Sequence, residues 1–225
     1  RLNWLTGFTG SAGLAVVLAD RAVLFVDGRY TLQAAEQVDG DLFEIRHLID
    51  QPPTDWVAEA LGSDARLGFD AWLHTGDGAR RYRRATEKSG AKLIAEDTNP
   101  IDTVWYHQPP PPLSPIAIQD VAHAGKTSEE KRQDIAKILA KAGEDAVVLT
   151  QPDSIAWLAN IRGGDVPYTP FVLGFAVLDK DAHLNIYTDR RKLMPNVEAA
   201  LEPGIAILPR GEFEGALALL GQAGL

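Results

Sequence analysis

Apolar and polar positions along the chain switch between the period of a strand and that of a helix, and they do so twice in the same order. Apolar runs over 14–18 and 22–26 flank a short polar turn and predict a β-hairpin. A further strand is expected over 42–46, then a helix over 56–61. The second copy repeats these elements in the same order, at 171–178, 184–187, 205–208 and 213–220. The repeat predicts two tandem, similarly built α/β domains with mixed sheets flanked by helices.

Each copy also contains elements that the other lacks. A helix over 128–141 and a strand over 146–150 precede Trp157, whereas only three residues precede Trp4, the corresponding position of the first copy. The first copy continues with a strand over 66–70, a helix and another strand, and the second copy ends where these would begin. We therefore expect an internal part of a longer protein, with the first copy truncated at its start and the second at its end.

Prolines separate the two copies. The run 109–112 consists of prolines alone, which fix φ and exclude helix. A stiff linker over about 106–122 is predicted, and a ligand for a proline-recognising domain is the alternative. Beyond it, Thr127 begins a Thr-Ser-Glu-Glu capping box, the start signal of a helix. We expect a first domain over 1–122, linker included, and a second over 123–225.

Three local details follow from the same patterns. Asp27 is expected to cap the element after the hairpin, with Arg29 in an ion pair, and Thr54 to cap the helix that follows Pro53. In the helix after the capping box, apolar residues recur at the spacing i, i+3, i+4 and i+7. They predict one buried face, formed by Ile135, Ile138, Leu139 and Ala142.

Composition narrows the possible partners and chemistry. The 22 Lys and Arg against 31 Asp and Glu give a formal net charge of −9, which argues against nucleic acid or an anionic membrane as the main partner. Four arginines over 80–84 are interpreted as the solvated face of a helix. The chain has no cysteine, which fits a cytoplasmic protein and excludes thiolate metal sites within it.

Some motifs resemble those of catalytic sites, but the elements predicted next to them do not fit such sites. The glycine-rich stretch 6–13 is followed by a strand, whereas a phosphate-binding loop needs a helix there. The five histidines are scattered, and the carboxylates show no paired spacing. We therefore assign no catalytic residue and no metal ligand to this chain. The loop over 160–170 is longer than its counterpart in the first copy and rich in Gly, Pro, Arg and Tyr. Functional residues are expected in this loop; a structural lid over the domain edge is the alternative.

Four stretches in order carry a resemblance to a known family. They are 4–13, 26–34, 99–105 with the prolines after it, and 153–163 continuing to Asp165 and Pro170. Together they resemble the amino-terminal two-thirds of the Xaa-Pro aminopeptidase P family in its longer, three-domain form. Their order favours this form over prolidases and creatinases, which carry one such leading domain.

The resemblance implies two creatinase-type N-terminal domains followed by a C-terminal pita-bread domain. That last domain binds two divalent metals, usually manganese, and removes the N-terminal residue from peptides with a penultimate proline. Its ligands would lie beyond residue 225, so this chain is expected to hold no cofactor and to be inactive alone. The leading domains are expected to aid homodimerisation and to wall the active-site mouth. We accordingly expect Arg162, Asp165 and Tyr168 near the substrate entrance.

Two other hypotheses about the function of the protein remain open. A prolidase or creatine amidinohydrolase belongs to the same superfamily. A catalytically dead, peptidase-like module would instead bind proteins, as in histone-chaperone relatives. Metal ligands beyond residue 225 would separate an enzyme from a binding module.

Overall fold

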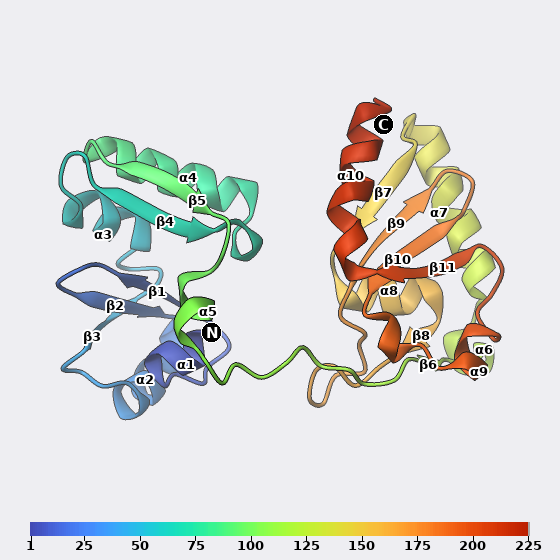
Figure 1. Cartoon of the computed structure of the whole chain (residues 1–225), viewed down its shortest axis with the longest axis horizontal. Helices are drawn as coiled ribbons and strands as arrows, with labels where there is room; N and C mark the ends of the chain where they lie inside the picture. Colours follow the sequence, from blue (N-terminus) through green and yellow to red (C-terminus); the bar gives the residue numbers. More distant parts are fainter. Residues whose placement is uncertain (225) are drawn as a thin grey trace. The chain divides into compact units, whose positions relative to one another are not determined.

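The computed structural model describes residues 1–224 and divides the chain into two compact units, Arg1–Pro109 and Pro110–Leu225 (Figure 1). Each unit has its own sheets, helices and hydrophobic core. The expectation of two α/β domains with mixed sheets flanked by helices is therefore confirmed.

The first unit is built on a three-stranded mixed sheet. Strand β1 (Gly13–Val17) pairs antiparallel with β2 (Ala22–Val26), which pairs parallel with β3 (Phe43–His47). A separate parallel pair is formed by β4 (Arg66–Asp70) and β5 (Lys92–Glu96). The helical elements are α1 (Leu2–Thr6), η1 (Gly28–Tyr30), α2 (Thr31–Gln37), α3 (Pro53–Ala60), η2 (Ala71–Leu73), α4 (Gly76–Lys88) and α5 (Pro100–Val104).

Strand β2 lies at the centre of this unit because both of its faces are apolar. Leu24 and Val26 belong to the core cluster that also contains Phe8 on one face. Val23 and Phe25 belong to the cluster on the other face, which α3 and α4 cover. Burial on both faces explains why the sequence of β2 is a continuous apolar run and not an alternation of apolar and polar residues.

The second unit contains a four-stranded sheet in the order β11-β10-β9-β7. Strand β9 (Phe175–Asp179) pairs antiparallel with β7 (Ala146–Leu149) and with β10 (Leu184–Thr188). Strand β11 (Ile205–Pro209) runs parallel to β10. The other elements are β6 (Ala117–Ile118), α6 (Val121–Ala124), α7 (Ser128–Ala142), α8 (Pro152–Ala159), β8 (Ile161–Arg162), η3 (Arg190–Lys192), α9 (Pro195–Glu198), η4 (Arg210–Glu212) and α10 (Phe213–Gln222).

The internal repeat appears in strand pairing and in a turn. In both units an antiparallel hairpin is followed by a parallel third strand. After the hairpin, the Asp27 carboxylate accepts the backbone N–H of Arg29 and pairs with its side chain. The Asp189 carboxylate does the same with Arg191. The predicted cap by Asp27 and the ion pair of Arg29 are confirmed, and the second unit uses the same turn.

The capping box at Thr127 is confirmed, but two helix details are wrong. Helix α3 begins at Pro53 with Pro52 at its N-cap position, so Thr54 lies inside the first turn and caps nothing. On α7, Ile138 is 62% exposed and Ala142 is exposed as well, whereas the buried face includes the polar residues Lys131 and Arg132.

These two cations can be buried because carbonyl groups of neighbouring segments accept hydrogen bonds from them. The Lys131 ammonium donates to the carbonyl of Trp157, and the Arg132 guanidinium donates to the carbonyls of Ala182 and Pro203. Long polar side chains can thus replace apolar ones on a helix face when their ends find acceptors.

The second unit begins before the boundary expected at residue 123. Ile116 is buried in its core, and its backbone N–H donates to the carbonyl of Lys192 at 2.9 Å. Strand β6 pairs antiparallel with β8. The end of the proline-rich segment therefore packs with the second unit, because it adds a short strand and a core side chain there.

Core packing leads to a stability prediction with a matched control. Leu178 on β9 is fully buried, whereas Leu219 on α10 is 67% exposed. Leu178→Ala should lower the free energy of unfolding by about 2–5 kcal/mol, since it leaves a cavity. Leu219→Ala should change it by less than about 0.5 kcal/mol. Chemical denaturation of both variants measures the difference, and equal losses would contradict the assigned core.

Candidate functional site

The loop between β8 and β9 folds back on itself as a second, narrow hairpin, distinct from the strand hairpins described above. Hydrogen bonds join its two ends, which are called its feet below. At its base, the N–H of Gly163 donates to the carbonyl of Pro170 and that of Asp165 to the carbonyl of Phe171, both at 3.3 Å. Gly163 is required there, because a Cβ would lie 2.8 Å from a methyl carbon of Val172. The backbone thus closes on itself and projects a short turn.

The tip of the hairpin is a turn over Val166, Pro167, Tyr168 and Thr169. The N–H of Thr169 donates to the carbonyl of Val166 at 3.1 Å, and Tyr168 has φ 60°. Proline second and a positive φ third are typical of a type II turn, whose third position favours glycine or asparagine. A left-handed backbone costs a residue with a Cβ about 1–2 kcal/mol.

No packing within this unit offsets that cost, because the Tyr168 side chain is fully exposed. An aromatic residue in a strained and solvated position is an outlier that motivates a functional hypothesis. Among the three residues that the sequence singled out, Tyr168 is the one whose side chain is free to contact another molecule.

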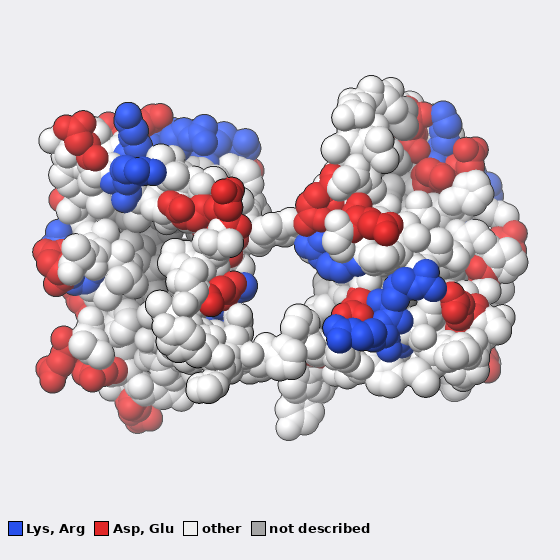
Figure 2. Space-filling view, in the orientation of Figure 1, with Lys and Arg blue, Asp and Glu red and all other residues white. Residues whose placement is uncertain are grey.

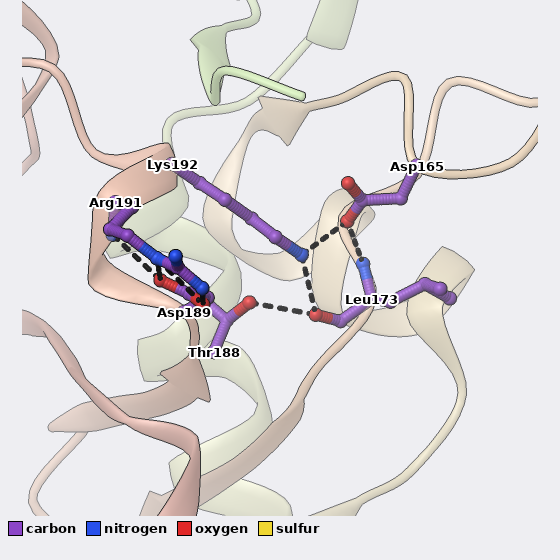
Figure 3. A network of polar contacts seen from close by, with 6 residues as sticks. All are labelled: Asp165, Leu173, Thr188, Asp189, Arg191 and Lys192. Carbon is purple, nitrogen blue, oxygen red and sulfur yellow. Dashed lines mark hydrogen bonds and ion pairs between the residues drawn. The ribbon is translucent and has the colours of Figure 1, made fainter. Parts of the chain in front are cut away.

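Asp165 lies at the base of the same hairpin, buried in an ion pair. Its Oδ2 lies 2.6 Å from Nζ of Lys192, and the two side chains are 0% and 4% exposed. Oδ2 also accepts the N–H of Leu173 at 2.7 Å. In Figure 3, Lys192 reaches from η3 across to Asp165, with Leu173 beside both.

The carbonyl of Leu173 completes this network. It accepts the Thr188 hydroxyl at 2.7 Å and is 3.4 Å from Nζ of Lys192. The other carboxylate oxygen of Asp165, Oδ1, is buried without a partner among the described residues. The loop is thereby tied to the end of β10 and to η3 through buried polar groups.

Arg162 bonds to a different part of the second unit. Its Nη1 donates to the carbonyls of Ala156 and Ile161, at 3.0 and 2.8 Å. It therefore satisfies a carbonyl in the last turn of α8, as basic side chains near helix ends do. Arg162 at the end of β8 and Asp165 in the loop after it therefore bond to different parts of the second unit.

Next to the buried pair, Asp189 and Arg191 form an exposed one. Side-chain hydrogen bonds from Arg191 lower the pKa of Asp189 to about 2. In the first unit, Arg29 likewise lowers the pKa of Asp27. Both aspartates are therefore ionised near neutral pH, and the Asp189–Arg191 pair lies in the turn that places Lys192.

Lys192 is the residue that sequence reasoning missed. It closes a run of three cations, Arg190 to Lys192, that looks like an exposed basic patch in the sequence. The available signal was the repeat, since Lys192 follows Asp189 by three positions as Tyr30 follows Asp27. In the first unit, the Tyr30 hydroxyl lies 2.7 Å from the hydroxyl of Ser11 in the glycine-rich loop.

Other surface features of the described chain offer less chemistry. An open recess of about 600 Å³ lies between α7, α8 and β7, and its lining is mostly apolar with Asp153 as one charged member. The arginines of α4 are exposed, which confirms the solvated-face interpretation, and basic side chains gather over α4 in Figure 2. Within residues 1–224, three His, Asp or Glu side chains nowhere come together to hold a metal ion. No helix described here has the length and apolar character to cross a membrane.

Both units match models of one family. Two models described as creatinase/prolidase N-terminal domain match residues 1–101 and 107–224. Aminopeptidase P1 of Lotus japonicus is 36% identical over 90% of this chain and 30% of its own length. A probable Xaa-Pro aminopeptidase P of Arthroderma gypseum is 37% identical over 92% of this chain and 33% of its own length.

A solved structure agrees with these matches. The X-prolyl aminopeptidase from Caenorhabditis elegans, described as a cytosolic enzyme with a di-nuclear active site, superposes with a TM-score of 0.90 and 28% identity. The match covers 99% of this chain and 37% of that one. The chain thus spans about a third of the length of these relatives.

The fold is a tandem pair of α/β domains, each with a strand hairpin and a parallel third strand. The candidate site is a strained loop in the second domain, held by a buried ion pair. The chain belongs to the creatinase/prolidase N-terminal domain family and carries two copies of that domain.

The buried pair gives a second stability prediction. Lys192→Met should lower the free energy of unfolding by about 3–5 kcal/mol, because it leaves the Asp165 carboxylate buried without a counter-ion. The matched control is Lys180→Met, since Lys180 pairs with Asp145 in an exposed position. That change should cost below about 1 kcal/mol. Denaturant titration compares the two, and similar small costs would show that the Asp165 site is solvated.

A third prediction concerns the strain at Tyr168. Tyr168→Gly should leave the free energy of unfolding unchanged or raise it by up to about 1 kcal/mol, since glycine adopts a positive φ without strain. Tyr168→Ala removes the same ring but keeps a Cβ, so it should not stabilise. Thermal denaturation of both variants is the measurement. A loss of stability in the glycine variant alone would contradict the assigned turn.

Proposed function

We propose that this chain is the N-terminal, non-catalytic portion of a metal-dependent Xaa-Pro aminopeptidase. The observation that carries the proposal is the ordered match of both units to the corresponding part of proteins named aminopeptidase P. Two leading domains of this kind distinguish the proposal from a prolidase or creatinase with one.

The reaction that we infer is removal of the N-terminal residue from short peptides whose second residue is proline. We assign the chemistry, and two divalent metals that we take to be manganese, to a further domain of the longer protein. A two-metal centre activates a bridging water and stabilises the oxyanion that forms at the peptide carbonyl. The di-nuclear site in the description of the nematode enzyme supports this assignment. The fragment alone is accordingly inactive.

Within such an enzyme, we assign the hairpin with Tyr168 to the active-site entrance. Tyr168 supplies the accessible contact, while Asp165 and Arg162 hold the loop through buried or half-buried hydrogen bonds. The two units also contribute to a homodimer in the cytoplasm. Neither nucleic acid nor a membrane is a partner in this proposal, in line with the net charge of −9.

The proposal predicts a metal-dependent activity of the longer protein. Purified longer protein with manganese should release the first residue of an Xaa-Pro-Xaa tripeptide, and chelation should abolish the release. A tripeptide with alanine in place of proline is the specificity control, and residues 1–225 alone are the inactive control. A longer protein that releases nothing with any divalent metal would instead indicate a protein-binding module.

A further inference from the structure

The two ends of the hairpin differ in how they are held. At the tip, Tyr168 combines a left-handed backbone with full exposure. At the feet, Asp165 and Leu173 are joined directly, since the carboxylate of one accepts the N–H of the other. A strained tip keeps one conformation only when its surroundings determine that conformation.

Lys192 is the group that holds both feet from outside the loop. Its ammonium lies 2.6 Å from Oδ2 of Asp165 and 3.4 Å from the carbonyl oxygen of Leu173. Its own backbone carbonyl accepts the N–H of Ile116, so its position is fixed from the other side as well. A shift of Lys192 would therefore move the base on which the Tyr168 turn stands.

The repeat shows that this position anchors a loop in both units. In the first unit, Tyr30 bonds to Ser11 through two exposed hydroxyl groups. In the second unit, the same position holds Lys192 and its loop partner is the buried Asp165. The buried, charged version occurs in the unit whose loop carries the strained aromatic residue.

A buried ion pair is by itself weak evidence for a stabilising contact. Well-packed apolar residues of similar volume often replace a buried pair at no loss of stability. Among the described residues, Lys192 contacts Oδ2 of Asp165, and Oδ1 of the same carboxylate has no hydrogen-bond partner. What the pair supplies is a directed contact that sets where the hairpin points.

We propose that Lys192 is a positioning residue for substrate binding, which acts by holding the hairpin so that the Tyr168 ring contacts the incoming peptide. The proposal rests on the entrance role assigned above. Because the loop carries no reacting group, its contact is made equally in the bound substrate and in the transition state. Loss of such uniform binding raises KM and leaves kcat unchanged.

A double-mutant cycle in the longer protein tests whether Lys192 acts through Tyr168. With an Xaa-Pro-Xaa peptide, Lys192→Met and Tyr168→Gly should each raise KM by about tenfold, the effect of losing one contact, with kcat within about twofold. The double variant should show no higher KM than either single variant, because the same contact is lost in all three. The proposal would be overturned if the KM increases of the two single variants multiplied in the double variant, or if kcat alone fell.

A second variant keeps the test decisive if Lys192→Met fails to fold. Asp165→Asn with Lys192→Met removes both charges, so no uncompensated ion stays buried, and the asparagine oxygen still accepts the N–H of Leu173. This folded variant should still show a raised KM, and a wild-type KM there would refute a positioning role for Lys192. Lys180→Met, from an exposed pair, is the matched control and should keep both kinetic constants.

The same assay separates this proposal from the function on which it rests. A wild-type longer protein that releases no residue overturns the aminopeptidase assignment and the role of Lys192 together. If the wild type is active but the KM effects of Lys192→Met and Tyr168→Gly multiply in the double variant, only the role of Lys192 is overturned.

Discussion

The buried contact between Lys192 and Asp165 is the constraint on which the candidate site depends. It joins η3, the turn that follows β10, to the base of the loop between β8 and β9. Taking two charges out of water is expensive, and their attraction compensates only in a fixed geometry. The pair therefore determines the direction of the hairpin, and it makes a strained Tyr168 tip compatible with an ordered loop.

The repeat explains where this constraint comes from. In both units an aspartate turn lies between the hairpin and the parallel third strand. The residue three positions after the aspartate reaches back to the loop before the hairpin. A shared scaffold thus places an anchor at the same point twice. Tyr30 serves a short glycine-rich loop with an exposed hydroxyl contact, and Lys192 serves the longer one with a buried charge. The two units thus share a fold and differ in the length of this loop and in the residue that anchors it.

Sequence patterns predicted the parts of the structure that local chemistry determines. The apolar run of β2 and the capping box at Thr127 signal their elements without reference to distant residues. The burial of Lys131, Arg132 and Lys192 could not be predicted in this way, because their acceptors come from segments far along the chain. A charged side chain is solvated by default, and only the tertiary structure shows otherwise. The candidate loop itself was predictable from its length, whereas the separate roles of its residues were not.

Hydrogen exchange at the amide of Leu173 measures whether the Lys192–Asp165 pair holds the loop. This N–H donates to Oδ2 of Asp165, the oxygen that Lys192 holds. We expect a protected amide in the wild-type chain, and a loss of protection in Lys192→Met that exceeds the loss at the β10 amides. Equal changes at Leu173 and in β10, or no change at Leu173, would show that the ion pair does not hold the loop.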